Sequence, residues 1–418
     1  MSRVAIALCA DLESAHGLDL AGLAGEIEAL DPTATVEVVP DLCRSPGRVA
    51  EVASRSGARR LVLGLCARSQ AAHDFQAQAR KAGLDPFALQ ILDLAGAGPA
   101  AARLLVAAAA RLRAFPGSRP EQLKLRLLSL EDRRSRRSLF TLPPSTYEPV
   151  AAVEEDTCLG GERCGLCQPA CPVGALRPVA GRAAVERDLC IACGICVSLC
   201  PTGAISLPGA SLAQYEAELA VLLGAESPGL VITCRGAGED DAAAANGWLP
   251  VAVPCLGMVG AGWILQALAA GASAVALQPC GERCRSGAEG KLPELVDYCR
   301  QALALLGECS PAERVLLGPP PAAAAVSPLP SRPVRRERSL TLIEPAASAQ
   351  ALLELQAAYG AGAPPVLEHP ASPLGLVALR EQTCTACGAC AASCPTGALA
   401  SEEGAEETAV TCDAALCS

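Results

Sequence analysis

Residues 190–201 read CIACGICVSLCP, with cysteines at Cys190, Cys193, Cys196 and Cys200. Three thiolates at intervals of three residues can bind one cubane 4Fe–4S cluster, and a fourth cysteine followed by proline can reach a second cluster. A structural zinc site would instead show two separated C-x2-C pairs. The stretch therefore predicts an iron–sulfur module at this point of the chain.

A similar run lies just upstream, where residues 158–172 read CLGGERCGLCQPACP with three extra residues in the first gap. The two runs end alike, in CPVGAL and CPTGAI. Together they resemble a two-cluster bacterial ferredoxin over residues 151–208. The crossover rule of that family implies two ligand sets for two 4Fe–4S clusters: Cys158, Cys164, Cys167 and Cys200 for one, and Cys171, Cys190, Cys193 and Cys196 for the other.

A third run occupies residues 384–399, CTACGACAASCPTGAL, with regularly spaced cysteines at Cys384, Cys387, Cys390 and Cys394. Beyond it, TAVTCDAALCS (408–418) parallels AAVERDLCIAC (183–193). Cys417 then takes the place of the first ligand of a further run, and Cys412 lies on a strand. We expect residues 373–418 to form a second ferredoxin module that is cut short, with one or two further 4Fe–4S clusters when complete.

Composition narrows the class of protein. The 418 residues carry a net charge of −10 and only 2% aromatic residues, which disfavours binding to nucleic acid. No secretory signal precedes the 23 cysteines, so they predict metal binding in a reducing cytoplasm rather than a disulfide framework.

The charge-free stretch from residue 242 to residue 281 is long enough to cross a membrane. However, Pro250, Pro254 and Pro279 interrupt it. It fits better a strand at 249–253, a helix at 260–269 and a strand at 274–277 in a buried parallel sheet, and we expect no membrane span.

Two further regions alternate apolar strands with helical patterns, which predicts parallel sheets. In residues 1–114 each predicted strand ends at a cysteine, namely Cys9, Cys43 and Cys66, and in residues 209–318 the strands end at Cys234, Cys255 and Cys280, with Cys284 close behind. Because parallel strands end at one edge of a sheet, each group of thiols is expected to gather there.

The predicted fold class is therefore a multidomain α/β and α+β chain, in which two small parallel-sheet domains alternate with ferredoxin-like modules. Residues 115–150 are basic and proline-rich and indicate a linker, or alternatively a docking patch for an acidic partner. Residues 319–372 indicate a second linker of low complexity, with a possible helix near residues 347–358.

Residues 1–114 resemble the N-terminal domain of the heterodisulfide reductase A subunit, through LCRSPGR (42–48), CARSQAAHDF (66–75) and AGLDPFALQ (82–90). The resemblance implies that Cys9, Cys43 and Cys66 help to bind a further 4Fe–4S cluster. Asp11 stands where that family has another cysteine. A cluster with a ligand such as Asp11 and a domain without any cluster both remain open.

Residues 228–306 resemble the delta subunit of methyl-viologen-reducing hydrogenase, through VITC, VPCLGMV and LQALAAGASAVALQPCGERC. This resemblance implies a 2Fe–2S cluster held by Cys234, Cys255, Cys280 and Cys284, with Ala237 replacing a further cysteine of the family. Cys299 and Cys309 are expected to pack as small apolar residues.

These observations favour a non-catalytic electron-transfer subunit that relays electrons between partner oxidoreductases, by analogy a hydrogenase, a formate dehydrogenase or a heterodisulfide-reductase-like complex. One alternative is a flavin-dependent oxidoreductase with its own substrate. GAGPAA (96–101) superficially matches a flavin fingerprint but lacks the following acid-ended strand, so no flavin is predicted. The other alternative is a structural or redox-sensing metal protein.

Overall fold

The structure is a computed structural model. It describes residues 3–66, 72–127, 145–161, 164–223, 229–234, 248–321, 344–360, 362, 367–375, 377, 379–380, 382–394, 397–404 and 408–413. Ala237 and Cys417 lie outside these residues. The chain divides into two units, one made of residues 1–152, 207–224 and 239–249 and the other of residues 153–206, 225–238 and 250–418.

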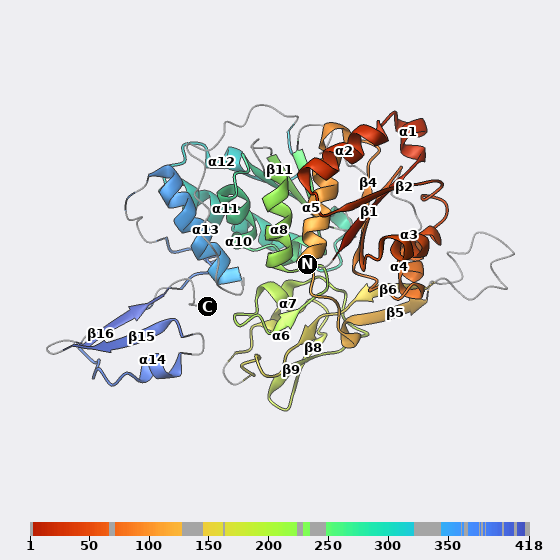
Figure 1. The fold of residues 1–418 in the computed structure, drawn as a ribbon. Coiled ribbons are helices and arrows are strands. Elements are labelled where there is room, and N and C mark those ends of the chain that lie inside the picture. Colours follow the sequence, from red (N-terminus) through yellow and green to blue (C-terminus); the bar gives the residue numbers. More distant parts are fainter. Residues whose placement is uncertain are drawn as a thin grey trace. The chain divides into compact units, whose positions relative to one another are not determined.

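The first unit is built on a parallel sheet with the strand order β2-β1-β3-β4. Its strands are β1 (Val4–Cys9), β2 (Thr35–Val39), β3 (Arg60–Leu65) and β4 (Leu89–Asp93). Helices α2 (Leu20–Leu30) and α5 (Ala101–Arg113) pack together over one face, and α3 (Arg48–Ser56) and α4 (Ala72–Lys81) over the other (Figure 1). Because helices cover both faces, every residue of the central strand β1 is buried.

Two other parts of the chain join this unit. The predicted linker 115–150 is not irregular throughout, since β5 (Leu123–Leu127) pairs antiparallel with β6 (Ser145–Pro149). The alternation of leucine with basic residues in β5 fits a strand with one apolar face. Helix α8 (Leu212–Leu222) packs against α5, where the buried guanidinium of Arg111 binds the Glu218 carboxylate at 2.6 Å.

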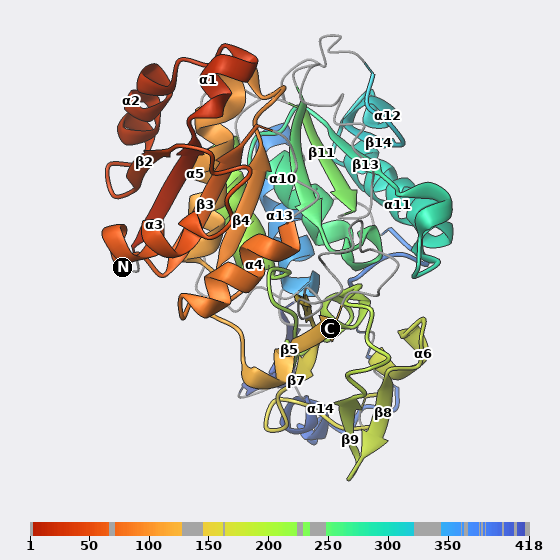
Figure 2. The ribbon, with the colours of Figure 1, turned by 90° about the vertical axis from the view of Figure 1, so that its right-hand side faces the viewer.

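The second unit contains another four-stranded sheet, ordered β12-β11-β13-β14. Strands β11 (Gly229–Cys234), β13 (Val275–Gln278) and β14 (Val315–Leu317) are parallel, and β12 (Trp248–Val253) borders β11. Helix α10 (Ala261–Ala269) contacts β13 and is fully buried, while α11 (Leu292–Leu305) packs on β14 and α13 (Glu344–Tyr359) packs on α10 (Figure 2). The strands and helix predicted in the charge-free stretch are thus confirmed. No described helix is long and apolar enough to cross a bilayer.

The ferredoxin-like parts are short elements around loops. Residues 153–206 include α6 (Cys167–Ala170), the hairpin β8 (Leu176–Val179) and β9 (Arg182–Val185), α7 (Ile195–Ser198), and the pair β7 (Ala152–Val153) and β10 (Ile205–Ser206). The C-terminal part contains α14 (Ala389–Ser393) and the hairpin β15 (Leu399–Glu403) and β16 (Thr408–Cys412). The predicted fold class, with parallel-sheet domains and ferredoxin-like segments, is confirmed.

Candidate metal centres

The first predicted set of ferredoxin thiols lines a single pocket. Cys158, Cys164, Cys167 and Cys200 all line this pocket, whose walls are mainly apolar. In the longer first gap of this run, Gly160 has a φ of +79°. A Cβ atom at Gly160 would stand 2.7 Å from the carbonyl oxygen of Gly181, so only glycine fits there. Despite the longer gap, Cys158 lines the same pocket as the other three thiols.

The thiols of the second set lie near enough to influence one another's ionisation. Burial raises the pKa of Cys193 to about 11 and also raises that of Cys196, and the neighbouring thiols, Cys171 and Cys190 among them, add to both shifts. No positively charged group among the described residues counteracts these pKa shifts. A metal ion would therefore have to displace the thiol protons when it binds.

The loop between Cys190 and Cys193 has a left-handed backbone at Ala192, with a φ of 57°, followed by Gly194 with a φ of 77°. The C-terminal run repeats this geometry at Ala386, with a φ of 54°, and at Gly388, with a φ of 65°. A left-handed residue turns successive backbone N–H groups toward one side, which is a common way to surround an anionic group. The same local sequence thus folds twice into the same cradle.

The C-terminal run also repeats the Cys–Pro turn. The N–H of Gly397 donates to the carbonyl of Cys394 at 3.3 Å, as the N–H of Gly203 does to Cys200. Cys412 pairs with Leu399 in the hairpin, the register that Val185 holds opposite Leu176. Cys412 therefore lies on the strand, as predicted, but its side chain is exposed. Of this run, Cys384, Cys387 and Cys390 are exposed.

Four thiols converge at the edge of the second sheet, following β11, β12 and β13. The Cys255 Sγ lies 3.0 Å from the Ser286 hydroxyl, which is also 3.4 Å from the Cys284 Sγ. The N–H of Leu256 donates to the Cys234 Sγ at 3.3 Å. Hydrogen bonds from the Cys234 thiol, from Ser286 and from Gly257 lower the pKa of Cys255 to about 6, despite its burial.

Sequence reasoning missed two polar residues of this edge, Ser286 and Glu289. A carboxylate oxygen of Glu289 lies within 4.8 Å of the sulfur atoms of Cys280 and Cys284. Its Oε1 atom is buried and has no hydrogen-bond partner among the described residues. An orphaned acceptor beside two thiols fits a site built to hold a metal centre. Neither residue belongs to a cysteine motif, so the sequence offered no signal for them.

The two remaining cysteines of this region differ. Cys299 is fully buried in α11, as predicted. The packing role predicted for Cys309 is wrong, because that residue is exposed. Helix α11 ends before it, and Gly307, with a φ of 102°, turns the chain outward.

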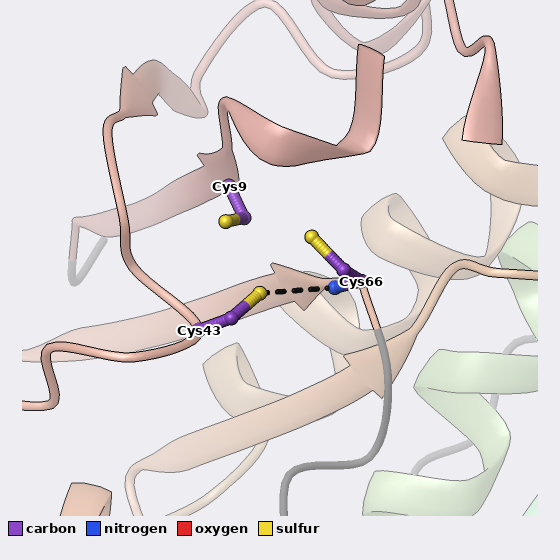
Figure 3. Close-up of side chains that lie close together, drawn as sticks. All are labelled: Cys9, Cys43 and Cys66. Carbon is purple, nitrogen blue, oxygen red and sulfur yellow. Dashed lines mark hydrogen bonds between the residues drawn. The ribbon is translucent and has the colours of Figure 1, made fainter. Parts of the chain in front are cut away.

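The edge of the first sheet brings together Cys9, Cys43 and Cys66 (Figure 3). Their sulfur atoms all lie within 4.8 Å of one another. Cys9 is the last residue of β1 and Cys66 directly follows β3, while Cys43 lies in the turn after β2. Among the described residues, Asp11 does not belong to this group.

Three models of known protein families match segments of the chain that carry many of these thiols. Models of a 4Fe-4S binding domain match residues 155–174, 183–206 and 378–400. The model of the methyl-viologen-reducing hydrogenase, delta subunit, matches residues 233–316. No match is found among curated proteins. These matches leave residues 1–114 uncovered, so the resemblance to the heterodisulfide reductase A subunit stays a prediction.

The pocket lined by Cys158 and the predicted ligands of the ferredoxin runs and of the second sheet edge fall within the matched segments, and the matches support an iron–sulfur protein with an electron-transfer role. It combines 4Fe–4S ferredoxin domains with a domain of the hydrogenase delta-subunit type.

Proposed function

We propose that this protein relays single electrons between partner oxidoreductases in a reducing cytoplasm. The predicted ligands are those of two 4Fe–4S clusters in residues 151–208, one 2Fe–2S cluster in residues 209–318, and one or two further 4Fe–4S clusters in the C-terminal module when that module is complete. Iron–sulfur clusters at these positions would supply one-electron redox chemistry. The partners best suited to such a relay are a hydrogenase, a formate dehydrogenase or a heterodisulfide-reductase-like complex.

One contact carries the proposal. Ile195 stands between the ligand candidates Cys193 and Cys196 and packs with Cys255 and Ala288 in one buried hydrophobic group. Cys193 packs against that hydrophobic group. Two predicted metal sites, one in the ferredoxin module and one at the second sheet edge, are therefore neighbours in the second unit. A short separation between centres is what a relay needs.

The backbone at this contact is closely fitted. An added Cβ at Gly194 would stand 2.9 Å from the Met258 Sδ, and one at Gly257 would stand 3.0 Å from the Ile195 side chain. The Ser198 hydroxyl donates to the carbonyl of Met258. The loop of the ferredoxin module and the turn η5 (Leu256–Met258) are thereby held together, with Cys255 directly before that turn.

Electron paramagnetic resonance of the fully reduced, anaerobically purified chain tests this proposal. Two reduced centres on either side of the contact should be magnetically coupled, and Cys193→Ser should leave an uncoupled 2Fe–2S signal. The matched control is Cys384→Ser, in the same position of the C-terminal run, which should preserve the coupling. Reduced protein without coupling, or coupling that survives Cys193→Ser, would overturn the relay.

Metal content separates the alternatives. Two 4Fe–4S clusters and one 2Fe–2S cluster require about ten iron and ten sulfide atoms per chain, and a further 4Fe–4S cluster adds about four of each. A flavin enzyme would instead release a yellow chromophore on denaturation. The flavin fingerprint would also require the strand after GAGPAA to extend the parallel sheet. Among the described residues, the strand after α5 is β5, which pairs with β6 in a separate two-stranded sheet.

A further inference from the structure

The three thiols at the first sheet edge are brought together by the fold and not by a local motif. They follow the adjacent strands β2, β1 and β3, and the N–H of Cys66 donates to the Cys43 Sγ at 3.1 Å (Figure 3). Cys9 is buried, and Cys43 and Cys66 are half-buried. Three side chains from separate strand ends are thus directed at one point.

The spacing of these sulfur atoms differs from that in the ferredoxin runs. The three sulfurs all lie within 4.8 Å of one another, whereas no three thiols of the described ferredoxin runs form so tight a group. Thiolates on a single tetrahedral zinc ion, with Zn–S bonds of about 2.3 Å, stand about 3.8 Å apart. In a cubane each thiolate binds a different iron, so its sulfurs spread further. The first sheet edge is sized for one ion.

The number of ligands is limited by the sequence. Residues 1–157 contain no cysteine besides Cys9, Cys43 and Cys66, so no fourth thiolate comes from this part of the chain. Among the described residues, no carboxylate or imidazole joins the group. The Nε2 atom of His16 lies 2.8 Å from the carbonyl oxygen of Cys66, and this contact holds α1 (Asp11–His16) beside the site. Within the part of the chain that the structure describes, the fourth position is therefore open to water or a small ligand.

We infer that Cys9, Cys43 and Cys66 bind a single zinc ion with three thiolates and one exchangeable fourth ligand. Thiolate ligands in tetrahedral geometry select zinc among the common divalent ions, and an open fourth position distinguishes such a site from a closed structural one. This site is separate from the relay, because none of its thiols belongs to a ferredoxin run or to the second sheet edge.

The test uses the whole 418-residue chain, purified anaerobically, with zinc and iron measured in the same samples. The unaltered protein should hold about one zinc, which Cys43→Ser and Cys66→Ser should each remove without changing the iron count. Cys309→Ser, which alters an exposed thiol in the other unit, is the control and should change neither metal. Absorption at the zinc edge should show three sulfur neighbours at about 2.3 Å and one lighter atom.

Cobalt serves as a second probe, because Co²⁺ bound by thiolates in a tetrahedral site absorbs visible light strongly. After zinc is removed by chelation, Co²⁺ should produce thiolate bands that Cys43→Ser abolishes while the far-ultraviolet circular dichroism stays unchanged. A loss of about four iron atoms in Cys43→Ser would overturn the inference in favour of a 4Fe–4S cluster. Unchanged zinc in both variants, or a disulfide among the three cysteines, would overturn it as well.

Discussion

Replacing Glu344 with glutamine should make the second unit more stable at alkaline pH. Glu344 is the first residue of α13 and is buried against α10, where the N–H of Gly262 donates to its Oε1 at 2.6 Å. The Ser348 hydroxyl donates to the same oxygen at 3.3 Å. Its Oε2 is buried and has no partner among the described residues. Burial raises the pKa of this carboxyl from 4.5 to about 7.

The sign and size follow from this shift. Between pH 4.5 and about 7 the Glu344 carboxyl holds a proton in the folded chain that it releases in the unfolded chain. The contribution of this group to the free energy of unfolding is therefore greatest below pH 4.5 and falls as the pH rises to about 7. Over the full shift the loss is about 3 kcal/mol. Glutamine keeps an oxygen that can accept from Gly262 and resembles the protonated acid. The variant should therefore match the original at acid pH and exceed it by up to about 3 kcal/mol above pH 7.

Tryptophan fluorescence during urea unfolding provides the assay, because the chain's two tryptophans lie in β12 and α10 of this region. Midpoints at pH 5 and pH 8 are compared for the original chain, Glu344→Gln and the control Glu294→Gln, whose carboxylate is exposed in α11. Equal pH dependence in all three proteins would refute the reasoning. So would a Glu344→Gln variant that is less stable at pH 8.

Two more predictions concern buried charge. Glu289→Gln removes a negative charge beside Cys280 and Cys284 and should raise the midpoint potential of the metal centre at that sheet edge by on the order of 100 mV. A redox titration followed by electron paramagnetic resonance measures this potential. An unchanged potential would mean that the Glu289 carboxylate does not act on the centre. Arg111→Leu leaves the Glu218 carboxylate buried without its partner and should destabilise the first unit by about 3–5 kcal/mol, whereas Arg111→Leu with Glu218→Leu should recover most of that loss. Urea unfolding followed by circular dichroism measures both, and a double variant as unstable as the single one would contradict the ion-pair explanation.

Much of the local structure could be predicted from the sequence. Strand and helix positions in both sheets follow from apolar runs and helical periodicity, as for α10 in the charge-free stretch. The cysteine spacing was sufficient to locate the 4Fe–4S binding domains. The pairing of β5 with β6 was missed, because a basic, proline-rich composition outweighed a short alternation of leucines.

The site itself was predicted less completely. Glu289 and Ser286 belong to no motif, and they reach the thiols only because η7 (Ala288–Lys291) and the turn before it fold over the sheet edge. The exposure of Cys309 depended on where α11 ends, and helix ends are poorly marked in this alanine- and leucine-rich segment.

Cysteine spacing by itself determined that this chain binds iron–sulfur clusters, because ligand intervals of three residues are a covalent property of the chain. Strand endings likewise determined that two groups of thiols would gather at sheet edges. Only the tertiary structure decided how near those thiols stand to one another and to other groups. It packs Cys193 against the buried group that contains Cys255, and it sets the sulfurs of Cys9, Cys43 and Cys66 within 4.8 Å of one another. Such distances depend on packing between elements that are far apart in sequence, which no local pattern encodes.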